Sequence, residues 1–105
     1  MTDILKNLES TIRMRRSADP ADSYVASLTA KGRAKMAEKI GEEATEAVIA
    51  AVQDDKAAMI GEAADLLFHL LVLLADMDLS IEDVLTELAR REGVSGFEEK
   101  ALRGS

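Results

Sequence analysis

The chain has 105 residues, 48% of them hydrophobic and 31% charged, with a net charge of −7 at pH 7. This length predicts one small domain over residues 1–105, and the acidic balance argues against general nucleic-acid binding. The absence of cysteine excludes disulfide scaffolds, cysteine-ligated zinc and thiol nucleophiles, while 3% aromatic residues and a single proline favour helices over strands.

Two features of the sequence argue against contact with a membrane. Polar residues interrupt the N-terminal segment, so it does not resemble a secretion signal. The longest apolar run, 66–75, is too short to span a bilayer. We therefore expect a cytoplasmic protein with no membrane partner.

The first half of the chain predicts helices separated by a polar loop. Apolar residues at helical spacing predict a helix over 3–16, and Pro20 marks a loop over 17–23. Residues 23–30 are expected to form one or two helical turns that end at Lys31 and Gly32.

A long helix is predicted over 33–52, and its two faces differ in character. One arc is apolar and is expected to form core; it comprises Met36, Ala37, Ile40, Ala44, Ala47, Val48 and Ala51. The other arc is charged; it comprises Lys35, Lys39, Glu42, Glu43 and Glu46. Glu43 falls at the seam between the two arcs, next to the core.

The next long helix is predicted over 56–77, after a break at 53–55. From Leu66 to Leu74 it is apolar nearly all round, which is typical of a buried helix. Its polar exceptions form one narrow stripe, and a polar stripe on a buried helix needs partners. The stripe consists of Glu62, Asp65, His69 and Asp76.

The last third of the chain predicts a turn over 78–80, a helix over 81–92 and a short terminal helix over 95–103. Ser80 is the expected N-cap, with Asp83 three residues later as in a capping box. Gly93 is expected to end the helix. The fold class predicted is all-α, a bundle of about four helices plus a short C-terminal helix.

Two acidic clusters are the strongest functional signal; they contain Glu42, Glu43 and Glu46, and Glu62 and Asp65. Carboxylates three or four residues apart share a helix face and repel one another unless a cation offsets their charge. If the two long helices pack antiparallel, Glu43 and Glu46 face Glu62 and Asp65. All-oxygen ligation suits Mg²⁺ or Mn²⁺. The alternative is two solvated acidic faces on separate sides.

More than one interpretation stays open for several of the remaining polar residues. Lys35 and Lys39 are either phosphate contacts or members of an ion-pair ladder with Glu42 and Glu46. Lys31 and Arg33 directly precede a helix N-terminus, where phosphate binds readily. His69 is a hydrogen-bond partner of the site, a substrate contact or, most often for a lone histidine on an apolar face, a satisfied core residue.

The pattern of EExxE over 42–46 followed by ExxD over 62–65 resembles the α-helical nucleotide pyrophosphohydrolases of the MazG type. Within that superfamily, SYVASLTAKG and the tail SGFEEKALR resemble the phosphoribosyl-ATP pyrophosphohydrolase family of histidine biosynthesis. The resemblance covers roughly residues 3–103. The acidic motif alone is specific only to the superfamily, and the loop and tail point to the narrower family.

The resemblance implies hydrolysis of 1-(5-phosphoribosyl)-ATP to the AMP derivative and pyrophosphate, by a homodimer. Mg²⁺ held by Glu43, Glu46, Glu62 and Asp65 is the implied cofactor. Glu42 is the expected proton acceptor, with Glu43 beside it, and Lys31, Arg33, Lys35 and Lys39 are the expected phosphate contacts. One alternative is a house-cleaning enzyme that hydrolyses dUTP or dCTP, and another is a non-enzymatic helical interaction module.

Overall fold

The computed structural model describes residues 3–94 and 96–103, and all of its regular structure is helical. The elements are α1 (Asp3–Arg15), α2 (Tyr24–Lys31), α3 (Arg33–Val52), α4 (Lys56–Asp76), α5 (Ile81–Arg90) and α6 (Gly96–Arg103). The predicted all-α class is confirmed. The expected start of the terminal helix at Ser95 lies outside the described residues.

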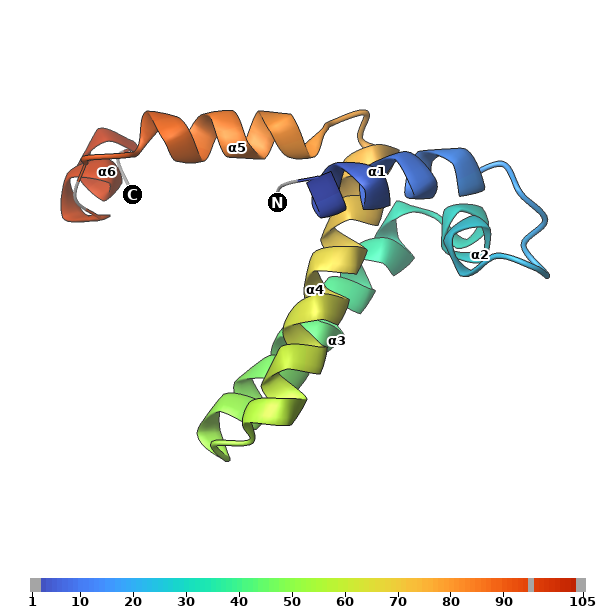
Figure 1. Ribbon diagram of the computed structural model, residues 1–105, viewed down its shortest axis with the longest axis horizontal. Helices are drawn as coiled ribbons and strands as arrows, with labels where there is room; N and C mark the ends of the chain where they lie inside the picture. Colours follow the sequence, from blue (N-terminus) through green and yellow to red (C-terminus); the bar gives the residue numbers. More distant parts are fainter. Residues whose placement is uncertain (1–2, 95, 104–105) are drawn as a thin grey trace.

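The α3–α4 hairpin dominates the arrangement (Figure 1). Its two helices run antiparallel, α1 packs across α4 near the open end, and α2 packs on α3. α5 and α6 extend away from the hairpin as an arm. The helices α1 to α4 therefore form one cluster. Together with the arm, the chain measures 46 × 34 × 29 Å.

The helix boundaries follow from local backbone chemistry, as the sequence predicted. Asp54 and Asp78 adopt positive φ angles of 55° and 59° directly after α3 and α4, which ends each helix. The Asp55 carboxylate then accepts from the Ala58 amide at 3.1 Å and begins α4. The capping box at Ser80 and Asp83 is confirmed.

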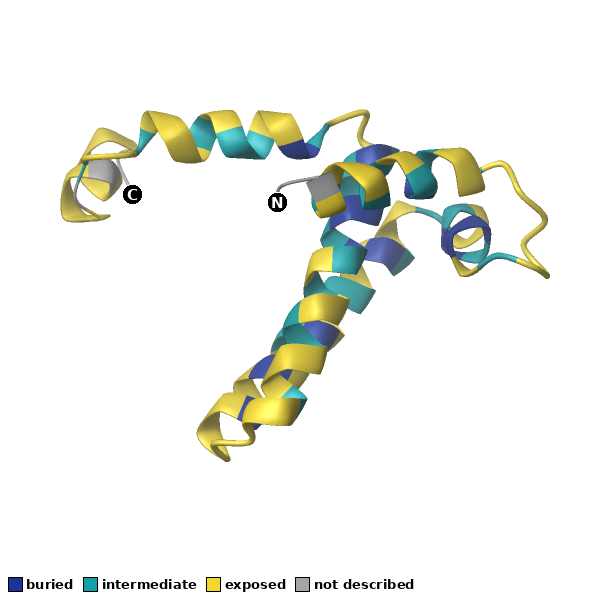
Figure 2. Ribbon diagram, viewed as in Figure 1, coloured by how far each residue is buried: buried dark blue, intermediate teal, exposed yellow. Residues whose placement is uncertain are grey.

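The buried core lies where α1, α2 and α4 meet the start of α3 and α5 (Figure 2). Its members are buried apolar side chains; they are Ile12, Val25, Leu28, Met36, Leu71, Val72, Ala75 and Ile81. The core therefore holds the open end of the hairpin, while most of the closed end is exposed.

The core face predicted for α3 is partly wrong. Met36 and Ala47 are buried, but Ala37, Val48 and Ala51 are exposed, and Val48 is 61% exposed. The buried arc also takes in Glu43 and Ala50. The reason is that α4 packs against the seam of α3 rather than against the middle of its apolar arc, so the carboxylate of Glu43 lies between the helices.

α4 is less buried than its apolar composition predicts. Leu71 and Val72 are in the core, whereas Leu67 is 46% exposed and Ile60 is 74% exposed. By length and composition alone, α4 is also apolar enough to cross a membrane. Only 22% of its most apolar 18-residue stretch is buried inside the structure. A long apolar face of α4 thus lacks a partner within the described chain.

Candidate metal centre

Three carboxylates from the two hairpin helices converge at mid-length. Glu43 of α3 and Glu62 and Asp65 of α4 each offer an oxygen, and these oxygens all lie within 4.8 Å of one another. Glu43 is only 8% exposed. Since buried charges are costly unless they are compensated, this grouping needs a proton or a cation.

Glu46 adjoins the cluster through Glu62. The pKa of Glu62 is raised to about 7, first by a hydrogen bond with Glu46, then by burial, with a smaller effect of Glu43. A raised pKa is expected when several like charges share one volume. The structure therefore brings together three of the four residues that the sequence proposed as metal ligands, and the fourth, Glu46, interacts with Glu62 beside them.

The oxygen donor atoms of the cluster suit a hard divalent cation. Among the described residues, the Oε2 atoms of Glu43 and Glu62 are buried without any hydrogen-bond partner. An ionised carboxylate only accepts, so neighbouring carboxylates cannot satisfy one another without a proton. Mg²⁺ and Mn²⁺ bind this kind of all-oxygen donor set.

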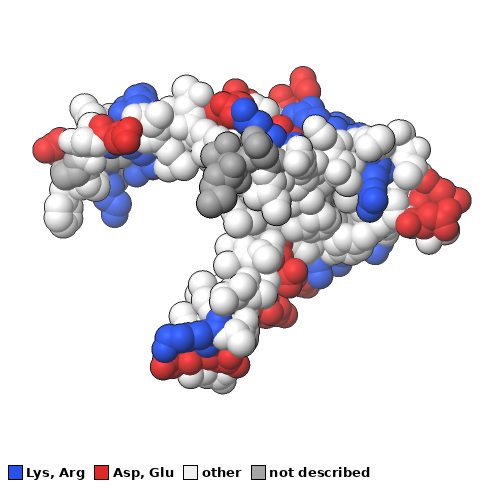
Figure 3. All heavy atoms as spheres, viewed as in Figure 1, with Lys and Arg blue, Asp and Glu red and all other residues white. Residues whose placement is uncertain are grey.

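Glu42 lies outside the three-residue cluster and pairs with a lysine. Lys39 Nζ lies 3.0 Å from Glu42 Oε2, and this hydrogen bond lowers the pKa of Glu42 and raises that of Lys39. Lys35 pairs with Glu38 at 3.0 Å, so the observed ion pairs differ from the ladder considered from the sequence. Acidic side chains gather along one edge of the hairpin (Figure 3).

Arg33 lies at the open end of the hairpin, bound to the end of α4. Its Nε is 2.7 Å from Asp76 Oδ2, and its Nη2 donates to the Asp76 carbonyl at 3.2 Å. Asp76 is fourteen residues from Glu62, about 21 Å along the helix. Lys31 is exposed at the end of α2, next to Gly32.

His69 is a fully satisfied buried residue. Its Nδ1 lies 2.7 Å from the Asp65 carbonyl, which only accepts, so Nδ1 carries the proton. In the neutral ring Nε2 then accepts from the Tyr24 hydroxyl at 2.8 Å. The sequence analysis missed Tyr24, although its being the only tyrosine in the chain was an available signal.

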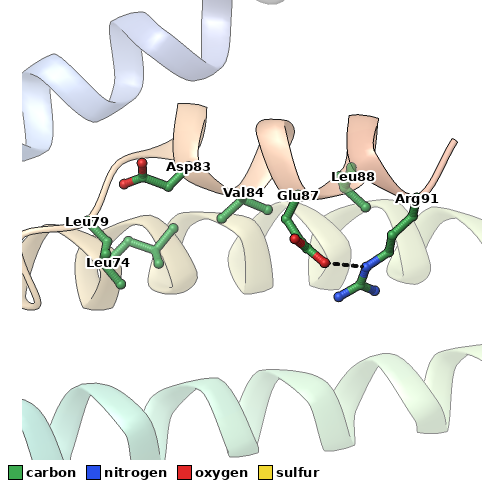
Figure 4. A pocket seen from close by; sticks show the side chains of 7 residues that line it. All are labelled: Leu74, Leu79, Asp83, Val84, Glu87, Leu88 and Arg91. Carbon is green, nitrogen blue, oxygen red and sulfur yellow. Dashed lines mark hydrogen bonds and ion pairs between the residues drawn. The ribbon is translucent and has the colours of Figure 1, made fainter. Parts of the chain in front are cut away.

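A groove of about 330 Å³ lies along α5 and shares no residue with the carboxylates (Figure 4). Leu74, Leu79, Val84 and Leu88 form its apolar surface, and Glu87 pairs with Arg91 at its edge. The groove offers no donor set for a metal. It is a largely apolar surface between the end of α4 and α5.

Known proteins resemble this chain over nearly its whole length. A family model described as phosphoribosyl-ATP pyrophosphohydrolase matches residues 5–92, which include the four carboxylates. The phosphoribosyl-ATP pyrophosphatase of Rhizorhabdus wittichii is 61% identical over 98% of this chain and 97% of the relative. The proteins of the same name from Novosphingobium aromaticivorans and Erythrobacter litoralis are 58% and 61% identical, covering 98% and 95% of this chain and 96% of each relative.

Proposed function

This chain belongs to the phosphoribosyl-ATP pyrophosphohydrolase family, and we propose that it hydrolyses phosphoribosyl-ATP to phosphoribosyl-AMP and pyrophosphate in histidine biosynthesis. The observation that carries the proposal is the convergence of Glu43, Glu62 and Asp65 within a hairpin that the family match covers. Such a cluster suits a reaction in which negative charge accumulates on a pyrophosphate leaving group.

Glu43, Glu46, Glu62 and Asp65 are the residues that would hold Mg²⁺, with Mn²⁺ as a second cation of the same ligand preference. When bound, the cation neutralises triphosphate charge and lowers the pKa of the attacking water. The two buried, unpartnered Oε2 atoms support this assignment, because they lack any donor among the described side chains.

Glu42 is the proposed proton acceptor for the attacking water. Lys39 lowers its pKa, so Glu42 is ionised at neutral pH, as a proton acceptor must be. Glu43, the neighbouring residue, is the second residue that we propose to take part in catalysis, as one of the carboxylates of the cluster.

Lys31, Lys35 and Lys39 are the proposed phosphate contacts. Lys35 and Lys39 already sit on the charged face of α3 with the glutamates. Arg33 was expected to join them, but its guanidinium binds Asp76. For Arg33 we therefore propose a role in holding the open end of the hairpin.

We propose that two copies of the chain associate through the exposed apolar surface of the hairpin. Leu71 and Val72 lie in the chain's own core, so the interface uses other parts of α4 than the centre of the 66–74 run. The exposed members of this surface are Val48, Ile49, Val52, Met59, Ile60 and Leu67. Their burial between two copies would remove a patch that monomers rarely expose.

The same surface explains why α4 is apolar along its length without crossing a membrane. Its polar stripe carries Glu62 and Asp65, which pack against α3, and a second copy would cover the apolar remainder. We accordingly propose a cytoplasmic enzyme that binds neither membranes nor nucleic acid, in keeping with its net charge of −7.

The deciding experiment is a pyrophosphate-release assay with Mg²⁺ on phosphoribosyl-ATP, ATP, dUTP and dCTP. The proposal expects the highest kcat/KM for phosphoribosyl-ATP and loss of activity in EDTA. Equal or faster turnover of dUTP or dCTP would identify a house-cleaning enzyme instead. Absence of activity on all four would favour a non-enzymatic helical module.

A further inference from the structure

Rings are rare in this chain, and three of them gather at one place. The chain has one tyrosine, two phenylalanines, one histidine and no tryptophan. The Tyr24 ring stacks on Phe68 with centroids 6.0 Å apart, and both meet His69 edge-on at 5.7 and 5.2 Å. Only Phe97, on the remote arm, lies outside this group.

The ring group adjoins the carboxylate cluster. His69 follows Asp65 by one helical turn, about 6 Å along α4, and its Nδ1 donates to the Asp65 carbonyl. The Lys39 ammonium lies near Tyr24 as well as Glu42, since both raise the pKa of Lys39, Glu42 more strongly. A lysine proposed to contact phosphate is therefore within electrostatic reach of both Tyr24 and Glu42.

The Tyr24 side chain is anchored by Phe68 and His69 but remains partly exposed to solvent. The next two residues of α2, Val25 and Ala26, are buried, whereas Tyr24 is 50% exposed. Phe68 packs against one face of its ring, and Nε2 of His69 accepts a hydrogen bond from its hydroxyl. This leaves an exposed part of the ring, and the lone pairs of the phenolic oxygen, available to a ligand with a flat base and hydroxyl donors.

We infer that Tyr24 is a specificity-determining contact for the adenine ring of the substrate, with His69 as the positioning residue that orients it. The inference rests on the proposed function, because it needs the triphosphate at the neighbouring carboxylates. An aromatic side chain stacked on a base strengthens binding of that base by roughly tenfold or more. Tyr24 thus supplies the base recognition that a cluster of carboxylates lacks.

Steady-state kinetics separate this role from a structural one. Tyr24→Leu should raise KM for phosphoribosyl-ATP about tenfold, and leave the inhibition constant of pyrophosphate, which has no base, unchanged. Tyr24→Phe keeps the ring but loses the hydrogen bond to His69, so its KM should fall between those of wild type and Tyr24→Leu. Phe97→Leu, which removes a 90% exposed ring on α6, is the matched control and should match wild type.

Tyrosine fluorescence gives a second readout that does not depend on turnover. Without tryptophan, and with one tyrosine, the emission of the chain comes from Tyr24 alone. AMP in EDTA should quench it saturably, after correction with free N-acetyltyrosinamide, whereas ribose 5-phosphate should not.

Two results would overturn the inference. One is a KM in Tyr24→Leu that equals that of wild type. The other is a parallel rise in KM and in the pyrophosphate inhibition constant, which is expected if Tyr24 only supports the packing of α2 on α4. A wild-type chain that releases no pyrophosphate from phosphoribosyl-ATP, yet shows AMP quenching, would contradict the proposed function and leave the base contact standing.

Discussion

Glu43 and Glu62 face each other across the α3–α4 hairpin, and each buries an Oε2 atom that no donor among the described residues reaches. Two carboxylates so placed destabilise the fold when both are ionised, because each loses hydration and repels the other. The folded chain gains stability from whatever neutralises them. Stability and activity should therefore respond in opposite ways to the loss of a carboxylate.

Glu62→Gln should raise the melting temperature of the metal-free protein at pH 8 by a few degrees and lower kcat at least about 100-fold. The amide removes one of the crowded charges, but it also removes a metal ligand. Glu46→Gln and Asp65→Asn should follow the same pattern. Thermal melts with and without Mg²⁺ check this, and Mg²⁺ should stabilise the wild type only.

The matched control for these variants is Glu38→Gln. Glu38 is also on α3, but it pairs with Lys35 and lies outside the carboxylate cluster. It should retain both activity and stabilisation by Mg²⁺. Site variants that melt well below the metal-free wild type would show that the carboxylates are structural partners, and the metal assignment would fail.

The metal-free protein should lose stability as pH rises from about 4.5 to about 7. The pKa of Glu62 is 4.5 ordinarily and about 7 in the fold, so the folded state holds this proton more tightly than the unfolded chain does. The stabilisation is complete below pH 4.5 and is lost above pH 7. Denaturant unfolding across this range measures it, and Glu62→Gln should flatten the profile.

Glu87 does not interfere with that measurement. Its pKa is lowered to about 2, chiefly by hydrogen bonds from Arg90 and then Arg91. Its contribution is present above pH 4.5 and is lost only towards pH 2. A wild-type profile that rises or stays level between pH 4.5 and 7 would contradict the proton sharing at Glu62.

Glu42→Gln should lower kcat about 100-fold while leaving Mg²⁺ binding intact, because Glu42 is proposed to accept a proton rather than to ligate the metal. Calorimetric titration of Mg²⁺ and steady-state kinetics measure the two effects. Lys39→Met is the informative comparison, since it breaks the same ion pair and keeps the carboxylate. If Glu42→Gln retains full kcat, Glu42 only anchors Lys39.

Arg33→Met and Asp76→Asn should each lower the free energy of unfolding by about 0.2–1 kcal/mol, the range for solvent-exposed ion pairs. The double variant should lose no more stability than either single variant, because both substitutions remove the same ion pair. KM for phosphoribosyl-ATP should not change in either variant. A large rise in KM for Arg33→Met alone would show that Arg33 contacts the phosphates of the substrate.

Sedimentation of the wild type should give twice the chain mass of 11.3 kDa at micromolar concentration. Ile60→Asp and Leu67→Asp should produce monomers, because each places a charge in the proposed interface. Leu102→Asp, on the arm, is the control and should remain dimeric; Leu102 is 72% exposed. A monomeric wild type would contradict the interface.

Much of the local structure could be predicted from the sequence, because it depends on neighbouring residues. The breaks after α3 and α4 and the capping box at Ser80 follow from polar side chains within a few positions of the backbone they satisfy. The acidic spacing on α3 and α4 likewise placed Glu43 and Glu62 on helix faces before any packing was known. The family match over residues 5–92 agrees with the resemblance that those motifs carry.

Tertiary packing decided what those faces meet. Helical periodicity gives the width of an apolar arc but not which edge of it the partner helix covers, so Val48 is exposed while Glu43 is buried. It also gives no account of contacts between distant segments. The bond from Tyr24 to His69 and the capture of Arg33 by Asp76 join residues more than forty positions apart, and both depend on how α2 and α3 pack on α4.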